Sequence, residues 1–481
     1  MLEKNQNVPA AGDAGWHSLF RGDNAIHSLV LCGGVALHAL NVYIVTTTMP
    51  SIVRDIGGLD YYAWSTTLFV AGSILGAALS GRLLGRMGAG VAYAAGALVF
   101  GVGTLLCASA PDMPTLLAGR AVQGFGGGLL YALAYGVIRM VFPAALWSRA
   151  IGLISATWGA ATLVGPAVGG VFAEFGIWRA AFWSLLPFTV LLAALALSTL
   201  PRTRSEPREP LPLKQLVLLL GIVLTLSVAS ARPTAGEQAA GVGAALVLFA
   251  GLIAIERRSI AKLLPRDALR PSSLLAALYA TIALAMIGMQ PEIFVPYFLQ
   301  ELHGRSPLAA GYIAALMALG WTAGSMTSAH WQGSRARKTI VAGPFFGLAG
   351  LLTIAVLMPL TTADFAAIAL PLSLGIAAVG FGIGIAWPHI VTAVYAGAPA
   401  GEEEKASASI TTVQLFAASL GAALAGMVAN LAGIDEGTPE GTAAAANWLF
   451  WLFALAPALG IICARGAGRS AALAKEHTDR P

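Results

Sequence analysis

Residues Gly152 to Gly170 read GLISATWGAATLVGPAVGG, an uncharged run in which small residues recur. They follow one another at helical steps of three and four residues: Gly152, Ser155, Gly159, Thr162, Pro166 and Gly169. One face of the predicted helix therefore carries almost no bulk, which lets another helix approach closely in lipid. Pro166 is expected to bend the helix, because it removes a backbone donor and clashes with the preceding turn. The pattern predicts a hinge or a seal, although ordinary tight packing in a membrane bundle explains the same residues.

The composition of the chain is that of a polytopic membrane protein. Of its 481 residues 57% are hydrophobic and 11% are charged, whereas about a quarter are charged in a soluble domain. The net charge of +5 does not favour a nucleic-acid partner, because Lys and Arg are spread over short loops. Cys32, Cys107 and Cys463 lie in apolar runs without paired or metal-type spacing, so neither a disulfide nor a metal site is expected.

Apolar runs of about 20 residues predict fourteen membrane-spanning helices. They lie near residues 25–48, 62–82, 90–110, 114–139, 149–173, 180–200, 213–231, 238–256, 273–299, 308–331, 339–360, 364–396, 406–431 and 445–465. We expect a cytoplasmic tail over 1–24, a six-helix bundle over 25–200, a linker with two extra spans over 201–271, a second six-helix bundle over 272–465 and a cytoplasmic tail over 466–481. The predicted fold class is an all-α polytopic membrane protein.

Lys and Arg fall mainly in alternate loops, and this asymmetry predicts the orientation of the chain. With both termini in the cytoplasm, the outer loops hold few of them: Arg54, Arg179, Arg232 and Arg305. The inner loop at 257–271 reads RRSIAKLLPRDALRP. It either lies on the inner leaflet through Ile260, Leu263 and Leu264 or forms a plain solvated linker.

The chain repeats itself at a distance of 256 residues. The run Gly124-Phe125-Gly126-x-Gly128 matches Gly380-Phe381-Gly382-x-Gly384, and the match continues without a gap to Gly170 and Gly426. The small-residue helix thereby has a counterpart in SITTVQLFAASLGAALAG, with Ala422 at the place of Pro166. A repeat of this size predicts two bundles related by an axis along the membrane normal, with a site between them at the midplane.

Several motifs occur together along the chain: Arg120-Ala-Val-Gln123-Gly124-Phe-Gly126-Gly127, the GPxxGG core at Gly165–Gly170, Trp178-Arg179, Pro296-Tyr-Phe-Leu-Gln300 and Ser306-Pro307-Leu-Ala-Ala-Gly311. In this combination the chain resembles the fourteen-helix drug:proton antiporters of the major facilitator superfamily over essentially its whole length. The resemblance implies two six-helix bundles with two inserted helices, and it marks an exporter motif at Gly152, Gly159, Gly165, Pro166, Gly169 and Gly170. A shared fold alone does not determine function, so the role of each residue must follow from its own chemistry and position.

Three ionisable residues in the predicted spans are candidates for proton coupling: Arg120, His38 and Glu292. Arg120 lies about 9 Å along a helix that starts near Pro114, where a guanidinium is costly and usually functional, unless it snorkels to the outer surface. The resemblance links the matching arginine to proton transfer, since a fixed positive charge lets a nearby acid release its proton. His38 either titrates near physiological pH or packs as a neutral residue. Glu292 follows Pro291, which loosens the helix and admits water; the alternative is a place at the outer rim.

The sequence departs at two places from the pattern of the family that it resembles. In the first span, LNVYIVTTTMP has Asn41 where relatives usually place an acid, and Asn41 cannot titrate. In the loop GRLLGRMGAG, Gly81, Arg86 and Gly88 fit the inner-gate motif, but Gly85 stands where an aspartate is usual. This loop therefore forms either an inner gate or a tight turn with an orientation charge. Glu174, near the outer lip, is expected to cap its helix or to pair with Arg179.

A cavity between the bundles is expected to hold an apolar substrate on aromatic, sulfur and amide side chains. The candidates are Asn41, Gln123, Tyr131, Trp158, Met289, Phe294, Trp321, Phe381, Trp387 and Gln414. Surfaces of this kind bind loosely and re-pack, as a multidrug site requires. The alternative for each aromatic residue is a place in the core or against lipid, and the alternative for Gln123 is a hydrogen bond to the next helix.

These features favour a transporter over an enzyme. An ATP-driven pump needs a phosphate cradle of the GxxxxGK type, and no Lys in the chain follows a Gly. The seven His residues are scattered without an HExxH motif, so a metalloenzyme is not favoured. A channel is an alternative that the sequence does not exclude, but Gly-rich helices in a repeated bundle suit alternating access better than a fixed pore. We expect a monomeric inner-membrane carrier without cofactor that exchanges protons for lipophilic compounds, cationic ones included. The alternative is an exporter of one metabolite or siderophore without proton coupling.

Overall fold

The computed structural model describes residues 15–203, 211–232, 234–361 and 364–478. Within these ranges the regular structure is helical, and fourteen segments are long and apolar enough to cross a membrane. The predicted all-α polytopic fold is confirmed. Residues 1–14 of the predicted N-terminal tail, residues 204–210 and 233 of the predicted linker, and residues 479–481 of the predicted C-terminal tail lie outside the described residues.

The helices follow one another along the chain with short connections. The first half contains α1 (Gly22–Ile56), α2 (Trp64–Met87), α3 (Ala89–Ala108), α4 (Met113–Val141), α5 (Trp147–Glu174), α6 (Arg179–Trp183) and α7 (Leu186–Thr199). Then come α8 (Leu213–Ser230) and α9 (Ala235–Arg258). The second half contains α10 (Leu274–Met289), α11 (Val295–Glu301), α12 (Pro307–Ser328), α13 (Gly333–Leu357), α14 (Phe365–Ala396), α15 (Glu403–Leu431), α16 (Pro439–Phe453) and α17 (Leu455–Thr478). Short 3₁₀ helices are η1 (Trp16–Phe20), η2 (Leu59–Tyr61), η3 (Ala144–Leu146), η4 (Gln290–Phe294) and η5 (Ile434–Glu436).

Helix ends and breaks follow local sequence signals. The Asp112 side chain accepts a hydrogen bond from the backbone N–H of Thr115 at the start of α4, and Ser306 does the same for Ala309 at the start of α12. The span that holds Pro291 is interrupted by η4, in agreement with the loosening expected there. By contrast, α5 runs through Pro166 as one helix. The Pro166 ring is accommodated within a helix whose neighbours are small.

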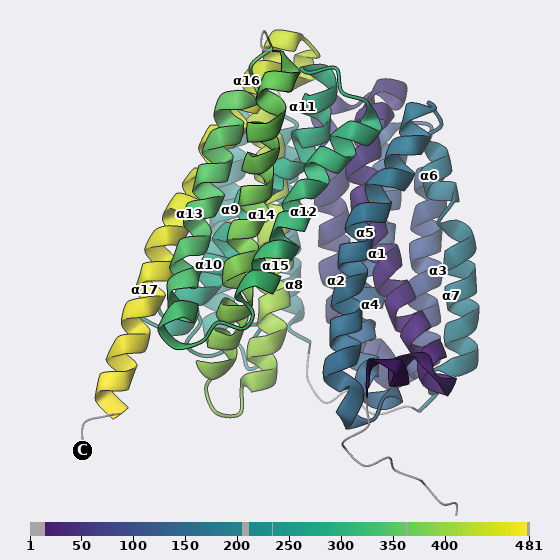
Figure 1. Ribbon diagram of the computed structural model, residues 1–481, viewed down its shortest axis with the longest axis vertical. Helices are drawn as coiled ribbons and strands as arrows, with labels where there is room; N and C mark the ends of the chain where they lie inside the picture. The colour runs from purple at the N-terminus through teal and green to yellow at the C-terminus, as the bar shows by residue number, and fades with distance from the viewer. Residues whose placement is uncertain (1–14, 204–210, 233, 362–363, 479–481) are drawn as a thin grey trace, which may run out of the picture.

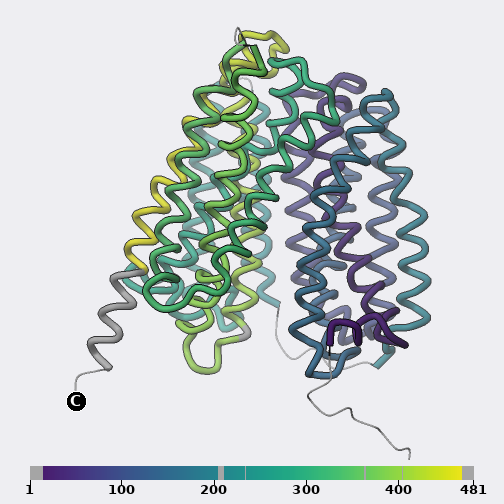
Figure 2. The backbone as a smooth tube through the Cα atoms, viewed as in Figure 1, coloured from purple at the N-terminus to yellow at the C-terminus, as the bar shows by residue number. Residues whose placement is uncertain are grey.

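The two halves of the chain lie side by side. Figure 1 shows α1 to α7 on the right and α10 to α17 on the left, and Figure 2 traces the same division by colour. Helices α8 and α9 pack against each other, and α8 also packs on α15 and α2. The inserted pair is therefore attached to both halves. The end of α17 and η1 lie at the lower end of the molecule in this view, whereas α6, α11 and α16 lie at the upper end.

The repeat in the sequence returns as the same glycine-lined crossing in each half. Helix α4 packs on α2, and α14 packs on α12. A Cβ added at four glycines would come within 1.7 to 2.2 Å of a backbone oxygen of the partner helix: Gly124 on Phe69, Gly128 on Ser73, Gly380 on Met317 and Gly384 on Trp321. These backbones touch directly, so only glycine fits. The partner helices contribute glycines at matching places, Gly72 and Gly76 in α2 and Gly320 and Gly324 in α12.

The hydrophobic cores join the halves at one end. One cluster of buried side chains draws on both halves, among them Met49 and Tyr62 from the first and Phe298 and Phe450 from the second. A second cluster lies within residues 19–200, and a third within residues 264–467. The shared cluster contains apolar residues from the end of α1, the start of α4 and α11, which meet at the upper end of Figure 1.

Candidate functional site

The upper end is held shut by polar and aromatic contacts between the halves. At the end of α1, Arg54 donates to Glu301 at the end of α11, with 2.5 Å from Nη2 to Oε1, and its Nη1 lies 3.4 Å from Oε1 of Gln300. Tyr62 stacks on Phe294 with ring centroids 4.8 Å apart. The amide nitrogen of Asn430 in α15 donates to the backbone oxygens of Asp60 and Ser230. Helix ends from both halves are thus tied together at this end.

The small-residue face of α5 is packed along one part and open along the other. A Cβ on Gly169 would lie 2.8 Å from the backbone oxygen of Ile44 in α1, and one on Gly170 would lie 2.6 Å from Cα of Leu308 in α12. Gly165 lies against Tyr43 in the same way, at 2.5 Å. A Cβ on Gly159 would meet no atom of another element within 4 Å. The C-terminal part of α5 therefore fills the space between α1 and α12, and the middle of the helix does not.

Two predicted members of this helix have other surroundings. Pro166 is buried and lies near Gly311 of α12, at 3.3 Å from the position of an added Cβ. At the other end, Gly152 lies against Trp16 of η1, at 3.1 Å. The N-terminal part of α5 is thus covered by η1 from its own half.

Arg120 is buried in a cage of neutral acceptors. Its side chain is 1% exposed, so it does not snorkel to the surface. Its Nη1 donates to Oδ1 of Asn41 and to Oε1 of Gln123, both at 2.5 Å, and its Nε donates to the backbone oxygen of Ser65 at 3.2 Å. The guanidinium carbon lies 4.2 Å from the ring centroid of Phe69. Arg120 forms no ion pair with a described residue, although a buried cation ordinarily needs one.

Polar atoms beside this cage have no partner in the described part of the chain. Nδ2 of Asn41 and Oγ of Ser65 are buried without a hydrogen bond. By contrast, Gln123 uses both ends of its amide, because its Nε2 donates to Oγ1 of Thr104 in α3 at 2.9 Å. Gln123 therefore bonds its own helix and the next one. The contacts of Arg120 with Ser65 and Phe69, and of Gln123 with Thr104, could not be predicted from the sequence. These are common residue types, and they lie in other spans.

His38 lies in an aromatic box next to this cage. Its ring stacks on Tyr131 with centroids 5.6 Å apart and meets Trp158 edge-on at 5.8 Å. The ring of Phe69 lies 5.1 Å away, so Phe69 contacts both His38 and Arg120. Nδ1 of His38 is buried without a hydrogen-bond partner among the described residues. Tyr131 and Trp158, predicted as cavity residues, are brought together here with a predicted proton carrier.

Glu292 lies in η4, within its span. Seven helical residues of α11 follow η4, so Glu292 is not at the rim of the helix. The side chain is partly exposed and makes no hydrogen bond or ion pair with a described residue. It is near enough to Tyr43 of α1 to interact with it electrostatically. A residue of the first half therefore lies within electrostatic range of Glu292.

The remaining predicted cavity residues lie in different surroundings. Trp321 and Trp387 meet edge-on, with centroids 5.3 Å apart. Met289 packs both against the core of the second half and against the core shared by the halves. Gln414 of α15 is partly exposed. Phe294 is 1% exposed within the core shared by the halves, and Phe381 packs on Phe346 of α13. In this conformation Phe294 belongs to the closed end, because its ring is stacked between Tyr62 and Phe298.

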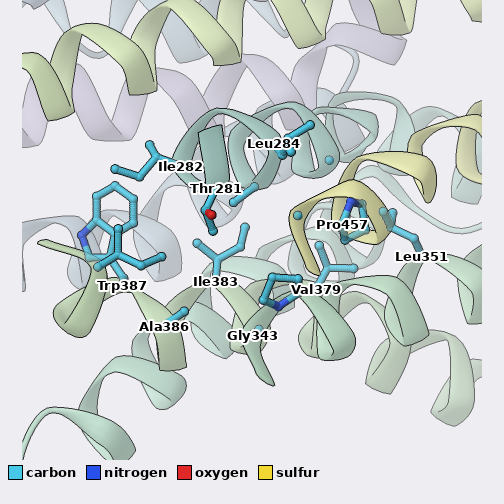
Figure 3. A pocket seen from close by; sticks show the side chains of 17 residues that line it. Thr281, Ile282, Leu284, Gly343, Leu351, Val379, Ile383, Ala386, Trp387 and Pro457 are labelled. Carbon is cyan, nitrogen blue, oxygen red and sulfur yellow. The ribbon is translucent and has the colours of Figure 1, made fainter. Parts of the chain in front are cut away.

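A small cavity lies inside the second half, away from the boundary between the halves. Figure 3 shows its walls, which are almost entirely carbon and come from α10, α13, α14 and α17. Trp387 and Thr281 line one end, and Pro457 lies at the other. The free volume is about 30 Å³, far below the roughly 300 Å³ at which ligand pockets begin. This void does not accommodate a drug-sized molecule.

The predicted inner-gate loop forms a tight turn. Gly88 ends α2 with φ of +80°, and a Cβ there would lie 2.8 Å from the backbone of Arg202. Glycine is therefore required by conformation and by contact. Gly85 is buried, whereas Gly81 and Arg86 are exposed. Arg86 has no ion-pair partner among the described residues.

The pairing expected for Arg179 is wrong. Its Nη1 donates to Oδ2 of Asp55 at 2.5 Å rather than to Glu174, and the indole nitrogen of Trp178 donates to the same oxygen at 3.1 Å. Asp55 directly follows Arg54 at the end of α1. Arg54 pairs with Glu301 of the second half, whereas Asp55 pairs with Arg179 of the first half. No pattern in the sequence favours Asp55 over Glu174, which is nearer to Arg179 along the chain.

The sequence matches the Major Facilitator Superfamily over residues 31–422. A probable multidrug-efflux transporter of Mycobacterium tuberculosis is 39% identical over 445 residues, which cover 90% of this chain and 93% of that protein. The tetracenomycin C resistance and export protein of Streptomyces glaucescens is 29% identical over 63% of this chain and 57% of its own length.

Solved structures are similar over almost the full length. A peptide transporter of the POT family in complex with sulfate gives a TM-score of 0.67 at 15% identity, covering 92% of this chain and 95% of that one. The xylose transporter XylE from E. coli gives a TM-score of 0.58 at 15% identity, covering 91% and 97%. At these identities the likeness shows the fold alone.

Proposed function

Because the chain belongs to the Major Facilitator Superfamily, we propose that it is a secondary active efflux transporter that exports lipophilic compounds, cationic ones included, in exchange for protons. Membership makes it a multi-pass membrane transporter rather than an enzyme. The drug-efflux assignment is supported by the names of its relatives, above all the probable multidrug-efflux transporter that matches 90% of the chain. We place it in the cell inner membrane as a monomer, with both termini in the cytoplasm and residues 25–200, 201–271 and 272–465 as its two bundles and their linker.

The observation that carries the proposal is the asymmetric packing of α5. Gly165 to Gly170 are wedged between α1 and α12, while Gly159 has no neighbour on its open face. In an alternating-access carrier one end is sealed while the other is free to admit substrate. With the termini in the cytoplasm, the sealed end faces outward. In this account Gly152, Gly159, Gly165, Pro166, Gly169 and Gly170 form the sliding surface, and the loop of Gly81, Gly85, Arg86 and Gly88 lies at the inner gate.

Proton coupling is assigned to Glu292, His38 and Arg120. Glu292 has no hydrogen-bond or ion-pair partner among the residues that the structure describes, and it is partly exposed, as a group that exchanges protons must be. His38 has a free ring nitrogen beside Tyr131 and Trp158. Arg120 supplies a fixed positive charge that disfavours a second cation nearby. Binding of a proton and binding of a cationic substrate are thereby made mutually exclusive, as exchange of one for the other requires.

The substrate surface is assigned to residues on both sides of the boundary between the halves. The first half contributes Asn41, Gln123, Tyr131 and Trp158, and the second contributes Met289, Phe294, Trp321, Phe381, Trp387 and Gln414. Phe294 takes part only once the closed end has opened, since its ring is otherwise covered. Aromatic and sulfur side chains accept varied apolar shapes, which suits a broad substrate range.

A second candidate function is export of one metabolite or siderophore without proton coupling. The observation that favours it is the bond between Arg120 and Asn41, which occupies the place where the resembling family has an acid.

Export of several unrelated dyes from loaded cells, before and after the pH gradient is collapsed, distinguishes the two functions. The main proposal expects several dyes to leave and their export to stop with the gradient. Export that is indifferent to the gradient contradicts proton antiport, and movement of one solute alone supports the second candidate.

A further inference from the structure

The connection between α9 and α10 forms a cationic cavity at the end of a membrane span. Its volume is about 290 Å³, and four of the side chains that line it are basic: Arg257, Lys262, Arg266 and Arg270. Glu256 also lines it, but both of its oxygens are occupied. Nε2 of Gln215 donates to one at 3.1 Å, and the backbone N–H of Leu264 donates to the other at 2.7 Å. The buried Glu256 therefore holds the connection in place and leaves the cations to face the cavity.

The four basic side chains of the cavity differ in whether they already form an ion pair with a carboxylate. Arg266 lies 3.3 Å from Glu402, and Arg270 lies 2.9 Å from Asp267. Burial disfavours the charge on Glu402, but the backbone N–H of Arg266 and the cations of Lys405 and Arg266 outweigh it and hold the pKa of this carboxyl below its ordinary value. Arg257 and Lys262 form no ion pair with a residue that the structure describes. Two basic side chains of the cavity thus remain available to an anion.

The surroundings of the cavity point to lipid. Only 17% of the apolar window of α9 is buried inside the protein, so the helix that leads to the cavity presents most of its length to the bilayer. Between the two unpaired cations, the side chain of Ile260 is 98% exposed. An isoleucine beside basic residues at the end of a span fits the boundary between headgroups and acyl chains, where basic pockets bind anionic lipid.

We propose that Arg257, Lys262, Arg266 and Arg270 bind the headgroup phosphate of an anionic phospholipid, with Ile260 inserted among its acyl chains. The connection also touches the second half, because Oγ of Ser409 in α15 donates to the backbone oxygen of Leu263 at 2.7 Å. The bound lipid would thus contact a segment fixed to both α9 and α15. The inference needs only the membrane placement of α9, so it stands or falls independently of export and its direction.

The test compares two charge-removing double variants in lipid binding. Arg257→Gln with Lys262→Gln removes the unpaired cations of the cavity, and Arg337→Gln with Lys338→Gln removes two exposed cations at the start of α13 as a matched control. Each purified full-length protein is titrated with phosphatidylglycerol in neutral detergent, and bound lipid is counted by native mass spectrometry. The cavity variant is expected to bind roughly thirtyfold more weakly, about fivefold for each lost cation, and the control is expected to bind like the parent.

Further arms identify the source of the anion. Phosphatidylcholine is expected to bind without any difference between the variants. Inorganic phosphate alone is expected to leave the thermal unfolding midpoint unchanged; stabilisation by phosphate equal to that by phosphatidylglycerol would show a site for soluble anions and overturn the lipid assignment. Ile260→Asn is expected to weaken lipid binding with the cations intact. Equal losses in the cavity and control variants, or no loss in either, would also overturn the proposal.

Discussion

Arg120 and Asn41 form the least expected contact of the chain. A fully buried guanidinium relies on amide and backbone oxygens, and Asn41 retains an unpaired Nδ2 next to it. The depth of Arg120 in an apolar span identified it as a candidate, but a separation of 79 positions along the chain hides its contact with Asn41. Proximity across helices depends on tertiary packing, which local patterns do not encode.

Replacement of Asn41 tests whether this charge lacks compensation. Asn41→Asp keeps the shape and puts a carboxylate beside Arg120, so the apparent unfolding temperature in detergent should rise. Asn41→Ala removes an acceptor and should cost roughly 1.5–3 kcal/mol, the usual worth of a hydrogen bond to a charged group. A lower unfolding temperature for Asn41→Asp would mean that the charge is already balanced.

Glu292 can be neutralised without disturbing its surroundings. Glu292→Gln has nearly the same shape, and the carboxylate has no described hydrogen-bond partner to lose, so folding should be unchanged. Dye export should no longer respond to the pH gradient, as measured in loaded cells. Glu174→Gln, at the exposed end of α5, serves as the control and should keep the parent's response. Unchanged coupling in Glu292→Gln would move the proton site elsewhere.

At the scale of elements, α5 offers a matched pair of substitutions. Gly169→Ala brings a methyl group to 2.8 Å from the Ile44 oxygen and should destabilise the protein by about 1–3 kcal/mol through overpacking. Gly159→Ala has free space and should be neutral or stabilising, because Ala favours helix by up to about 1 kcal/mol over Gly. Thermal unfolding of both variants checks this. Equal effects would contradict the packing described for α5.

A bulkier substitution at Gly159 tests the opposite conformation, in which the open part of α5 is closed and the sealed end is open. If the open part of α5 closes when the other end opens, Gly159→Leu should leave thermal stability in this conformation nearly unchanged. Dye export should nevertheless fall several-fold or stop, because the side chain obstructs the closing movement. Full export by Gly159→Leu would show that this face never closes.

The elements themselves could be predicted well, for a physical reason. Hydrophobic length fixes membrane spans, so a predicted span at 364–396 compares with α14 at Phe365–Ala396 and one at 213–231 with α8 at Leu213–Ser230. Interruptions were harder. Pro291 indicated the interruption at η4, whereas α5 continues as one helix through Pro166, where the sequence predicts a bend. The local sequence does not say whether neighbouring residues accommodate a proline ring.

At the scale of the whole molecule, the arrangement is two repeated halves joined by a core at one end. The glycine crossings of α2 with α4 and of α12 with α14 make each half a tightly packed body. Among the described residues one ion pair joins the halves, Arg54 with Glu301, and a partly exposed pair of this kind contributes little. Two tightly packed halves that meet along a boundary are suited to rocking against each other. The sequence predicted the repeat but not the residues of the seal, because Arg54 was interpreted only as an orientation charge.

Locking the closed end tests alternating access most directly. In a chain without its native cysteines, Arg54→Cys and Glu301→Cys place two thiols at the ends of α1 and α11, where the native side chains meet. A short cleavable bifunctional thiol reagent should join them and stop dye export, and cleavage by reductant should restore it, while either single variant treated alike keeps exporting. Undiminished export by the fully cross-linked protein would contradict the account.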